Sequence, residues 1–369
     1  MIKVFEPKVS FYDKFYLLKN LHKNYISGTS PVIEEFESIL ANRFGRKYAI
    51  CVSNGTIALE VALKSLNLPK NSEVIVPSFT IISCLSAVYR ANLKPVFCDV
   101  DINSWNMTLS YVEKVVTKNT KALIMVHTYG LPCEAIEIEK FCKKNDIKVI
   151  EDSAEAHGIN IDERPCGSFG DCSTFSFYAN KHVTTGEGGA ILTDSKAQYD
   201  LLKLMINLDF TEPNRFNHEN FYWNYRLSGL QASLGISQIK SLNKTIKHKQ
   251  FQGKYYDFLL SELVERDKIQ IPIQNYKYVE NNYWVYGILL RDGSSRSKIR
   301  EYLYKNNVET RDFFWPLHLQ NAFLKKNNSE KKFINSEFLG KNGFYIPTGK
   351  HINKNKQKFI VEILKNYFG

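Results

Sequence analysis

Short, continuous apolar runs recur along the first part of the chain, separated by longer segments in which apolar residues return every three to four positions. The runs are residues 48–52, 73–77, 95–100, 121–127, 146–150, 174–178 and 188–193. Such runs are typical of strands buried on both faces, and the periodic segments between them are typical of helices. Strands that alternate with helices predict an α/β fold, with a mostly parallel sheet flanked by helices.

The pattern changes beyond a long basic helix that is predicted to begin near Asn243. Two strands, 283–290 and 309–314, are expected there, with a helix over 297–306 between them. We therefore predict two domains. Residues 1–245 form a large domain with an N-terminal arm, and residues 246–369 form a smaller α+β domain.

Two side chains stand out because each follows a predicted strand. Asp152 follows the run that ends at Ile150, and Lys181 follows the run 174–178. A glycine-containing segment, 184–189, comes directly after the lysine. Because ligands of parallel sheets collect at the carboxyl ends of the strands, we expect both groups in one site.

A third candidate is the turn Ser53-Asn54-Gly55-Thr56, which links the first of these strands to a helix. A glycine and a hydroxyl at a helix N-terminus leave free N–H groups that suit a phosphate. The alternative is that Ser53 or Thr56 only caps the helix. Taken alone, the turn favours neither interpretation.

Asp152 and Lys181 also have structural alternatives. Residues 152–155 match the capping-box pattern of a helix start, and a lysine after a strand is usually solvated. A partly buried lysine, however, can act as an amine nucleophile or a base. Pyridoxal phosphate needs such a lysine, a carboxylate for its ring nitrogen and a phosphate seat, and Lys181, Asp152 and Gly55-Thr56 together would supply them.

Composition narrows the class of protein. The chain has 369 residues, 44% of them hydrophobic, and its N-terminus alternates apolar and polar residues instead of forming a signal peptide. No apolar run reaches the roughly 18 residues of a membrane helix. Seven cysteines without a CxxC pair argue against a disulfide framework or a metal site. We expect a cytoplasmic protein that does not bind a membrane.

The formal net charge is +11, which by itself is compatible with nucleic acid, an anionic membrane or an anionic small substrate. The lysines follow no recognisable nucleic-acid motif and are not interleaved with aromatic residues. A solvated lysine-rich surface is therefore the preferred interpretation, and nucleic acid is not expected as a partner. The positive field would still attract a phosphorylated substrate.

Several motifs, in order along nearly the whole chain, resemble one known family. They are residues 53–56, 73–77, 151–158, 167–171, 175–181, 185–189, 224–227 and 311–318. On these motifs the chain is identified as a member of the DegT-type nucleotide-sugar aminotransferases, and is most similar to their perosamine-type branch. The resemblance implies a pyridoxal phosphate enzyme of fold type I, like aspartate aminotransferase, that works as a homodimer.

The resemblance also implies roles for individual residues. Lys181 would hold the cofactor covalently and then move a proton between the amino-acid and sugar carbons, while Asp152 would keep the ring nitrogen protonated. The other cofactor contacts implied are Gly55, Thr56 and Ser176 at the phosphate, Glu155 near the phenolic oxygen, Ile81 on the ring face, and Asn224 from the neighbouring subunit. Asn180, Arg311 and His318 are candidate substrate contacts.

The implied reaction transfers an amino group from glutamate to a nucleotide-linked keto-deoxy sugar, GDP-4-keto-6-deoxymannose, for a surface polysaccharide. Two alternatives stay open: the same chemistry on a dTDP- or UDP-keto sugar or a small phosphorylated ketone, and a non-catalytic regulatory or nucleic-acid-binding role. Ile81 departs from the family, whose members usually carry an aromatic residue there. His182 follows Lys181, and in a dehydratase branch histidine replaces the lysine itself; since Lys181 is present, transamination is expected.

Overall fold

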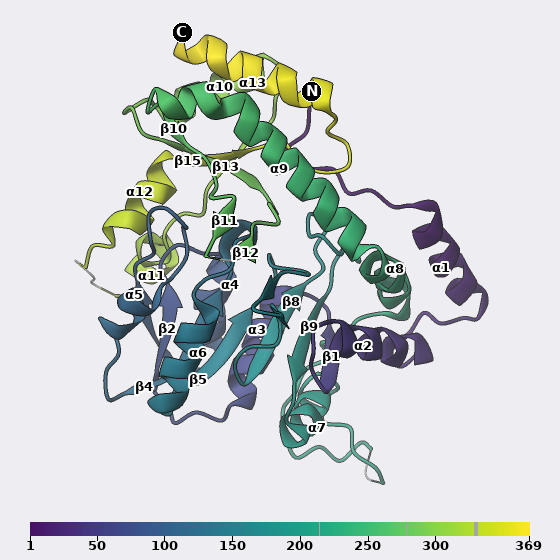
Figure 1. The fold of residues 1–369 in the computed structure, drawn as a ribbon. Coiled ribbons are helices and arrows are strands. Elements are labelled where there is room, and N and C mark those ends of the chain that lie inside the picture. Colours follow the sequence, from purple (N-terminus) through teal and green to yellow (C-terminus); the bar gives the residue numbers. More distant parts are fainter. Residues whose placement is uncertain (214, 278, 328–330) are drawn as a thin grey trace.

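Seven strands form the larger of the two main sheets in the computed structural model, which describes residues 1–213, 215–277, 279–327 and 331–369 (Figure 1). The strands are β1 (Tyr48–Val52), β2 (Glu73–Pro77), β3 (Lys94–Cys98), β4 (Thr120–Val126), β5 (Lys148–Asp152), β8 (Cys172–Ser176) and β9 (Gly189–Thr193). Their order is β1-β9-β8-β5-β4-β2-β3, and β9 runs antiparallel to both of its neighbours. The predicted α/β fold with a mostly parallel sheet is confirmed.

Helices cover both faces of this sheet because successive strand residues point to opposite sides. Ile50 and Val52 of β1 pack with α3 (Gly55–Ser65), α4 (Ile82–Arg90) and α7 (Lys196–Met205). Ala49 and Cys51 pack on the other side with α2 (Pro31–Arg43) and α8 (Gly229–Lys240), and α6 (Ala135–Lys144) continues that layer. The continuous apolar runs of the sequence are thus explained by burial on two faces.

The second main sheet has four strands in the order β10-β13-β15-β14. They are β10 (Ile269–Gln270), β13 (Tyr286–Leu290), β14 (Arg311–Asp312) and β15 (Gly343–Ile346), and each hydrogen-bonded pair is antiparallel. One face packs against α9 (Leu242–Glu265), α10 (Arg296–Lys305) and α13 (Lys354–Phe368). The predicted domain boundary after residue 245 falls inside α9, which is continuous, so the division into two domains stays a prediction.

The remaining elements are short or peripheral. They are α1 (Phe11–His22), α5 (Leu109–Glu113), the 3-10 helix Thr128–Gly130, β6 (Asn160–Ile161), β7 (Arg164–Pro165), β11 (Asn275–Tyr276), β12 (Val279–Glu280), the 3-10 helix Leu317–Leu319, α11 (Asn321–Leu324) and α12 (Ile334–Asn342). All seven cysteines are buried with free thiols. Over the described ranges, none of the helices combines the length and apolar character that crossing a membrane requires.

Candidate active site

A cavity of about 820 Å³ opens at the carboxyl ends of the strands of the large sheet. Its walls include the last residues of β5 and β8 and the turns that follow β1 and β2. Of the eleven candidate site residues, nine line this cavity: Gly55, Thr56, Ile81, Asp152, Glu155, Ser176, Asn180, Lys181 and Arg311. Parallel topology explains why residues so far apart in sequence meet here.

The turn after β1 presents a helix N-terminus to the cavity. Asn54 is the capping residue of α3, since its side chain accepts from the Ile57 amide at 2.9 Å; the alternative in which Ser53 or Thr56 caps the helix was therefore wrong. A side chain at Gly55 would place a Cβ 2.7 Å from the Ser176 Cβ. Glycine is thus required for the close approach, which leaves the first-turn amides facing the space beside Thr56 and Ser176.

Asp152 is a buried carboxylate with one largely free oxygen. It is 4% exposed; Oδ1 accepts from the Ala154 amide at 3.1 Å, and Oδ2 meets only the Cys84 thiol at 3.6 Å. Burial raises its pKa, and the Ala154 amide and the charge of Lys181 oppose that rise. No helix begins at this segment, so the capping-box alternative was wrong. The group is placed to accept a strong hydrogen bond from a cationic N–H.

Lys181 points at a carboxylate and at an aromatic ring. Its Nζ lies 3.3 Å from Glu155 Oε1 and 3.6 Å from the ring centroid of Trp284. Burial lowers the pKa of Lys181, although Glu155 and Asp152 favour its charged form. Burial also raises the pKa of Glu155 to about 6. A lysine whose pKa is lowered serves more readily as a nucleophile or base than a solvated one, so the solvated-lysine alternative was wrong as well.

Three aromatic residues of the cavity were not predicted from the sequence. Trp284, Phe314 and Tyr345 reach it from the segments around β13, β14 and β15, so the smaller sheet closes one side of the site. Trp284 also donates from Nε1 to the Asn180 carbonyl at 3.0 Å. Its apolar neighbours in the sequence gave no signal that this side chain would face the lysine and not the core.

Two candidates lie outside the cavity. Asn224 is exposed and its side chain accepts only from the Arg226 amide, at 3.4 Å. His318 is 2% exposed, with Ser78 Oγ 2.6 Å from Nδ1 and Glu337 3.3 Å from Nε2. Within this single chain neither residue reaches the site, and the surroundings of His318 are those of a core residue that joins two segments.

The comparisons with known proteins agree with this geometry. The model of the DegT/DnrJ/EryC1/StrS aminotransferase family matches residues 14–365. The chain belongs to this family. It is therefore a sugar aminotransferase, and like the family it depends on pyridoxal phosphate.

Individual relatives match the chain over nearly its whole length. The chain is 32% identical over 367 residues to GDP-perosamine synthase of Escherichia coli O157:H7, with 100% of this chain and 98% of the relative covered. It is 29% identical to dTDP-3-amino-3,6-dideoxy-alpha-D-galactopyranose transaminase of Aneurinibacillus thermoaerophilus, covering 91% and 90%. An aminotransferase structure from Psychrobacter cryohalolentis superposes with a TM-score of 0.91 at 25% identity, covering 98% of each chain.

The residues present fit pyridoxal phosphate. The close packing of Gly55 on Ser176 leaves a helix N-terminus open for a phosphate. The free Oδ2 of Asp152 can accept from a protonated ring nitrogen, and Lys181 supplies the amine. All of these groups line one cavity whose volume exceeds that of the cofactor alone, so the sugar aminotransferase has room for a second ligand.

Proposed function

We propose that this sugar aminotransferase transfers an amino group from glutamate to the C4 keto group of GDP-4-keto-6-deoxymannose, for the synthesis of a surface polysaccharide. The observation that carries the proposal is the full-length similarity to GDP-perosamine synthase of Escherichia coli O157:H7, at 32% identity. We place the reaction in the cytoplasm, because seven free cysteines suit a reducing compartment.

In this proposal Lys181 holds the cofactor and is the base that moves a proton from one carbon to the next. Its amine is suited to the task because burial lowers its pKa and so favours the neutral, basic form. Glu155 and Trp284 fix where Nζ lies, at 3.3 and 3.6 Å. Proton transfer needs such positioning, since the base must reach the reacting carbon within about 3 Å.

Asp152 keeps the ring nitrogen protonated in the proposed site. Bound pyridoxal phosphate supplies an electron sink for the substrate carbon, and that property depends on the protonated nitrogen. Asp152 can serve because it is buried yet keeps one oxygen without a strong partner. Gly55, Thr56 and Ser176 bind the phosphate, and Ile81, 38% exposed at the start of α4, covers the ring face.

Substrate contacts are assigned to Arg311 and Asn180. Arg311 lines the cavity from the smaller sheet and lies against the ring of Phe5 at 4.9 Å. Its guanidinium is suited to the diphosphate of a nucleotide sugar. The Asn180 side-chain Oδ1 is buried without a hydrogen-bond partner among the described residues, and a sugar hydroxyl would satisfy it. His318 lies in the core, so we assign it no contact with the substrate and only a role in positioning the residues around it.

A panel of keto sugars tests the proposal. Purified protein is incubated with ¹⁵N-glutamate and with GDP-, dTDP- and UDP-linked 4-keto-6-deoxy sugars, and the aminated products are identified by mass spectrometry. We expect label only in the GDP sugar. The Lys181→Ala variant should bind the cofactor without the visible absorbance band of the lysine-bound form and should give no product. Turnover of only a non-GDP sugar would contradict the proposal.

A second candidate is the same reaction on a dTDP- or UDP-keto sugar or a small phosphorylated ketone. The observation that favours it is Ile81, an aliphatic residue at the cavity where relatives usually have an aromatic one, together with 29% identity to a dTDP-sugar transaminase. The same panel separates the two candidates, because each predicts a different labelled product.

We further propose a homodimer in which Asn224 completes the partner's phosphate site. In support, Asn224 is exposed and does not line the cavity of its own chain, and its neighbours Phe221 and Trp223 expose large aromatic side chains. Exposed aromatic clusters of this kind are typical of interfaces between subunits.

A further inference from the structure

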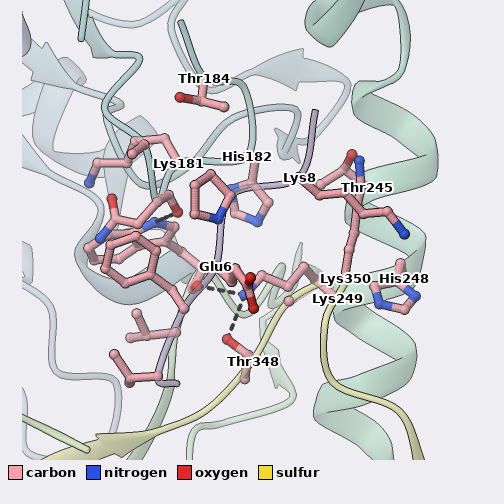
Figure 2. Close-up of a pocket in the computed structure, with 18 of the residues that line it drawn as sticks. Glu6, Lys8, Lys181, His182, Thr184, Thr245, His248, Lys249, Thr348 and Lys350 are labelled. Carbon is pink, nitrogen blue, oxygen red and sulfur yellow. Dashed lines mark hydrogen bonds between the residues drawn. The ribbon is translucent and has the colours of Figure 1, made fainter. Parts of the chain in front are cut away.

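A second, smaller cavity of about 80 Å³ adjoins the active site (Figure 2). Four residues line both cavities: Asn180, Lys181, Trp284 and Tyr345. The titratable groups that face the small cavity are, by element, Glu6 and Lys8 of the N-terminal segment, Lys181 and His182 after β8, His248 and Lys249 of α9, Tyr345 of β15, and Lys350 beyond it. Bases therefore far outnumber the one carboxylate, and that carboxylate is exposed.

Lys249 is the most unusual of these groups. It is 8% exposed, and its Nζ donates to the Trp284 carbonyl at 2.9 Å and to Thr348 Oγ1 at 2.6 Å (Figure 2). An ammonium has three N–H groups, so one is left over. Among the ion pairs of the described residues, none includes Lys249. A buried charge without a counter-ion is costly, and a bound anion would remove that cost.

His182, which also lines the small cavity, supports the same conclusion. It is 4% exposed, and neither ring nitrogen makes a well-formed hydrogen bond among the described residues, although the Asn282 backbone lies close enough to oppose the fall of its pKa. Most buried polar atoms in proteins are hydrogen-bonded, and an orphaned one commonly marks an absent water, ion or ligand. A histidine without firm hydrogen-bond partners and a lysine with a free N–H offer donors to an anion, and the one carboxylate that lines the cavity, Glu6, is exposed.

We propose that this cavity binds a small oxyanion, a carboxylate or a phosphate, through Lys249 and His182. Its volume suits such a group and a few waters but excludes a nucleotide sugar. Two sources share this chemistry. Because the cavity adjoins Lys181, the anion can be the side-chain carboxylate of the amino donor, an assignment that rests on the proposed function; otherwise it is a free oxyanion that acts from outside the reaction.

Anion binding at this cavity is coupled to protonation. Burial lowers the pKa of Lys249 to about 7, so the amine is a cation below that pH and largely neutral above it. Desolvation also lowers the pKa values of His182 and His248. An anion favours the charged forms, and binding should therefore take up a proton and be tighter at pH 6.5 than at pH 8.5, by roughly tenfold or more.

Calorimetric titration of the holoenzyme with glutarate and with sulfate tests the proposal, because both anions keep their charge across this pH range. We expect binding that weakens with rising pH, and that Lys249→Met and His182→Phe each weaken at least tenfold. Lys247→Met is the matched control: it removes an exposed lysine two residues away on α9 and should leave binding unchanged.

The kinetics of the variants distinguish the two sources. If the donor carboxylate occupies the cavity, Lys249→Met raises the KM for glutamate and leaves that for the keto sugar unchanged. If a free oxyanion occupies it, both KM values stay the same and sulfate still binds in competition with glutarate. Absence of binding by both anions, or binding equal in wild type and His182→Phe at all pH values, would overturn the proposal.

These outcomes do not depend on the identity of the sugar. The titration contains no keto substrate, so it can succeed even if the proposed GDP-sugar reaction is refuted by the substrate panel. Circular dichroism shows whether Lys249→Met folds. If that variant does not fold, the wild-type pH dependence together with His182→Phe, which keeps a planar aromatic ring but removes both nitrogens, decides the question.

Discussion

Lys181 lies between opposing influences on its charge. Burial lowers its pKa, and the nearby carboxylates of Glu155 and Asp152 raise it. The face of Trp284 at 3.6 Å also favours the ammonium. The effect of burial is the larger, so Lys181 is more readily deprotonated than an ordinary lysine. The neighbouring carboxylates reduce the size of the fall in its pKa.

Replacing Glu155 by glutamine tests this balance. The change keeps the side-chain volume and removes one negative charge, so the pKa of Lys181 should fall further. We would measure it in cofactor-free protein by NMR titration of ¹³C-methylated lysines. Glu187→Gln is the control, since Glu187 also lines the cavity but is exposed and its charge is screened. A rise in the Lys181 pKa on Glu155→Gln would contradict this account.

Lys249 leads to a second prediction, on stability. Its pKa is about 7 in the folded protein against 10.5 ordinarily, so between these pH values the unfolded chain holds more protons. The free energy of unfolding should therefore rise with pH in this window, by roughly 1 kcal/mol per pH unit from this group. Urea unfolding of wild type and Lys249→Met at several pH values should show a shallower rise in the variant. If the unfolding free energies of the two proteins changed in parallel with pH, the lowered pKa of Lys249 would be refuted.

Sequence reasoning found the residues whose place is set by the nearest strand. Asp152 ends β5, and Ser176 ends β8 just ahead of Lys181, so an apolar run with a polar end was enough to locate them. It missed Trp284 and Lys249, which are single positions in apolar or basic surroundings. Their importance arises only when the smaller sheet and α9 pack against the large sheet, and that packing is not encoded in local pattern.

Among the elements, those buried on two faces were predicted best and those at the surface worst. The helix α1 was taken for part of an arm, although Phe11, Phe15 and Leu18 recur at helical spacing. In the single chain these side chains are exposed, so they form no buried stripe. The helix α13 was missed because the lysines between 350 and 358 suggested a solvated segment. Its apolar residues beyond that segment, Ile360 and Leu364, pack in the core of the smaller sheet.

One contact between elements gives a prediction of its own. Gly253 of α9 faces the ring of Tyr283, and a Cβ there would lie 2.5 Å from the ring carbons. Alanine is the better helix former by about 1 kcal/mol, but overpacking costs about 1–3 kcal/mol. Gly253→Ala should therefore lower the stability by a net amount on the order of 1 kcal/mol in chemical denaturation. Ser261→Ala, on the exposed side of α9, should not, and an equally stable Gly253→Ala would contradict this packing.

At the scale of the whole molecule, the proposed dimer predicts that two inactive variants can restore activity in a mixture, which a monomer could not do. Lys181→Ala and Asn224→Ala proteins should each have little activity. If Asn224 serves the partner's site, a mixed dimer contains one site with both residues intact, so mixing the two variants after partial unfolding should restore activity up to about a quarter of wild type. Light scattering would establish the dimer, and mixtures that remain inactive would argue against a shared site.

The N-terminal segment joins parts of the chain that are far apart in sequence. The Ile2 amide donates to the Asn307 carbonyl at 2.7 Å, the Val4 amide donates to Glu309 at 3.0 Å, and Val4 is buried. Figure 1 shows this end of the chain beside the smaller sheet. During synthesis on the ribosome these first residues have no native partner until residues 307–309 have emerged. Their docking is therefore a late event in folding, and until then the smaller sheet is left without its N-terminal neighbour.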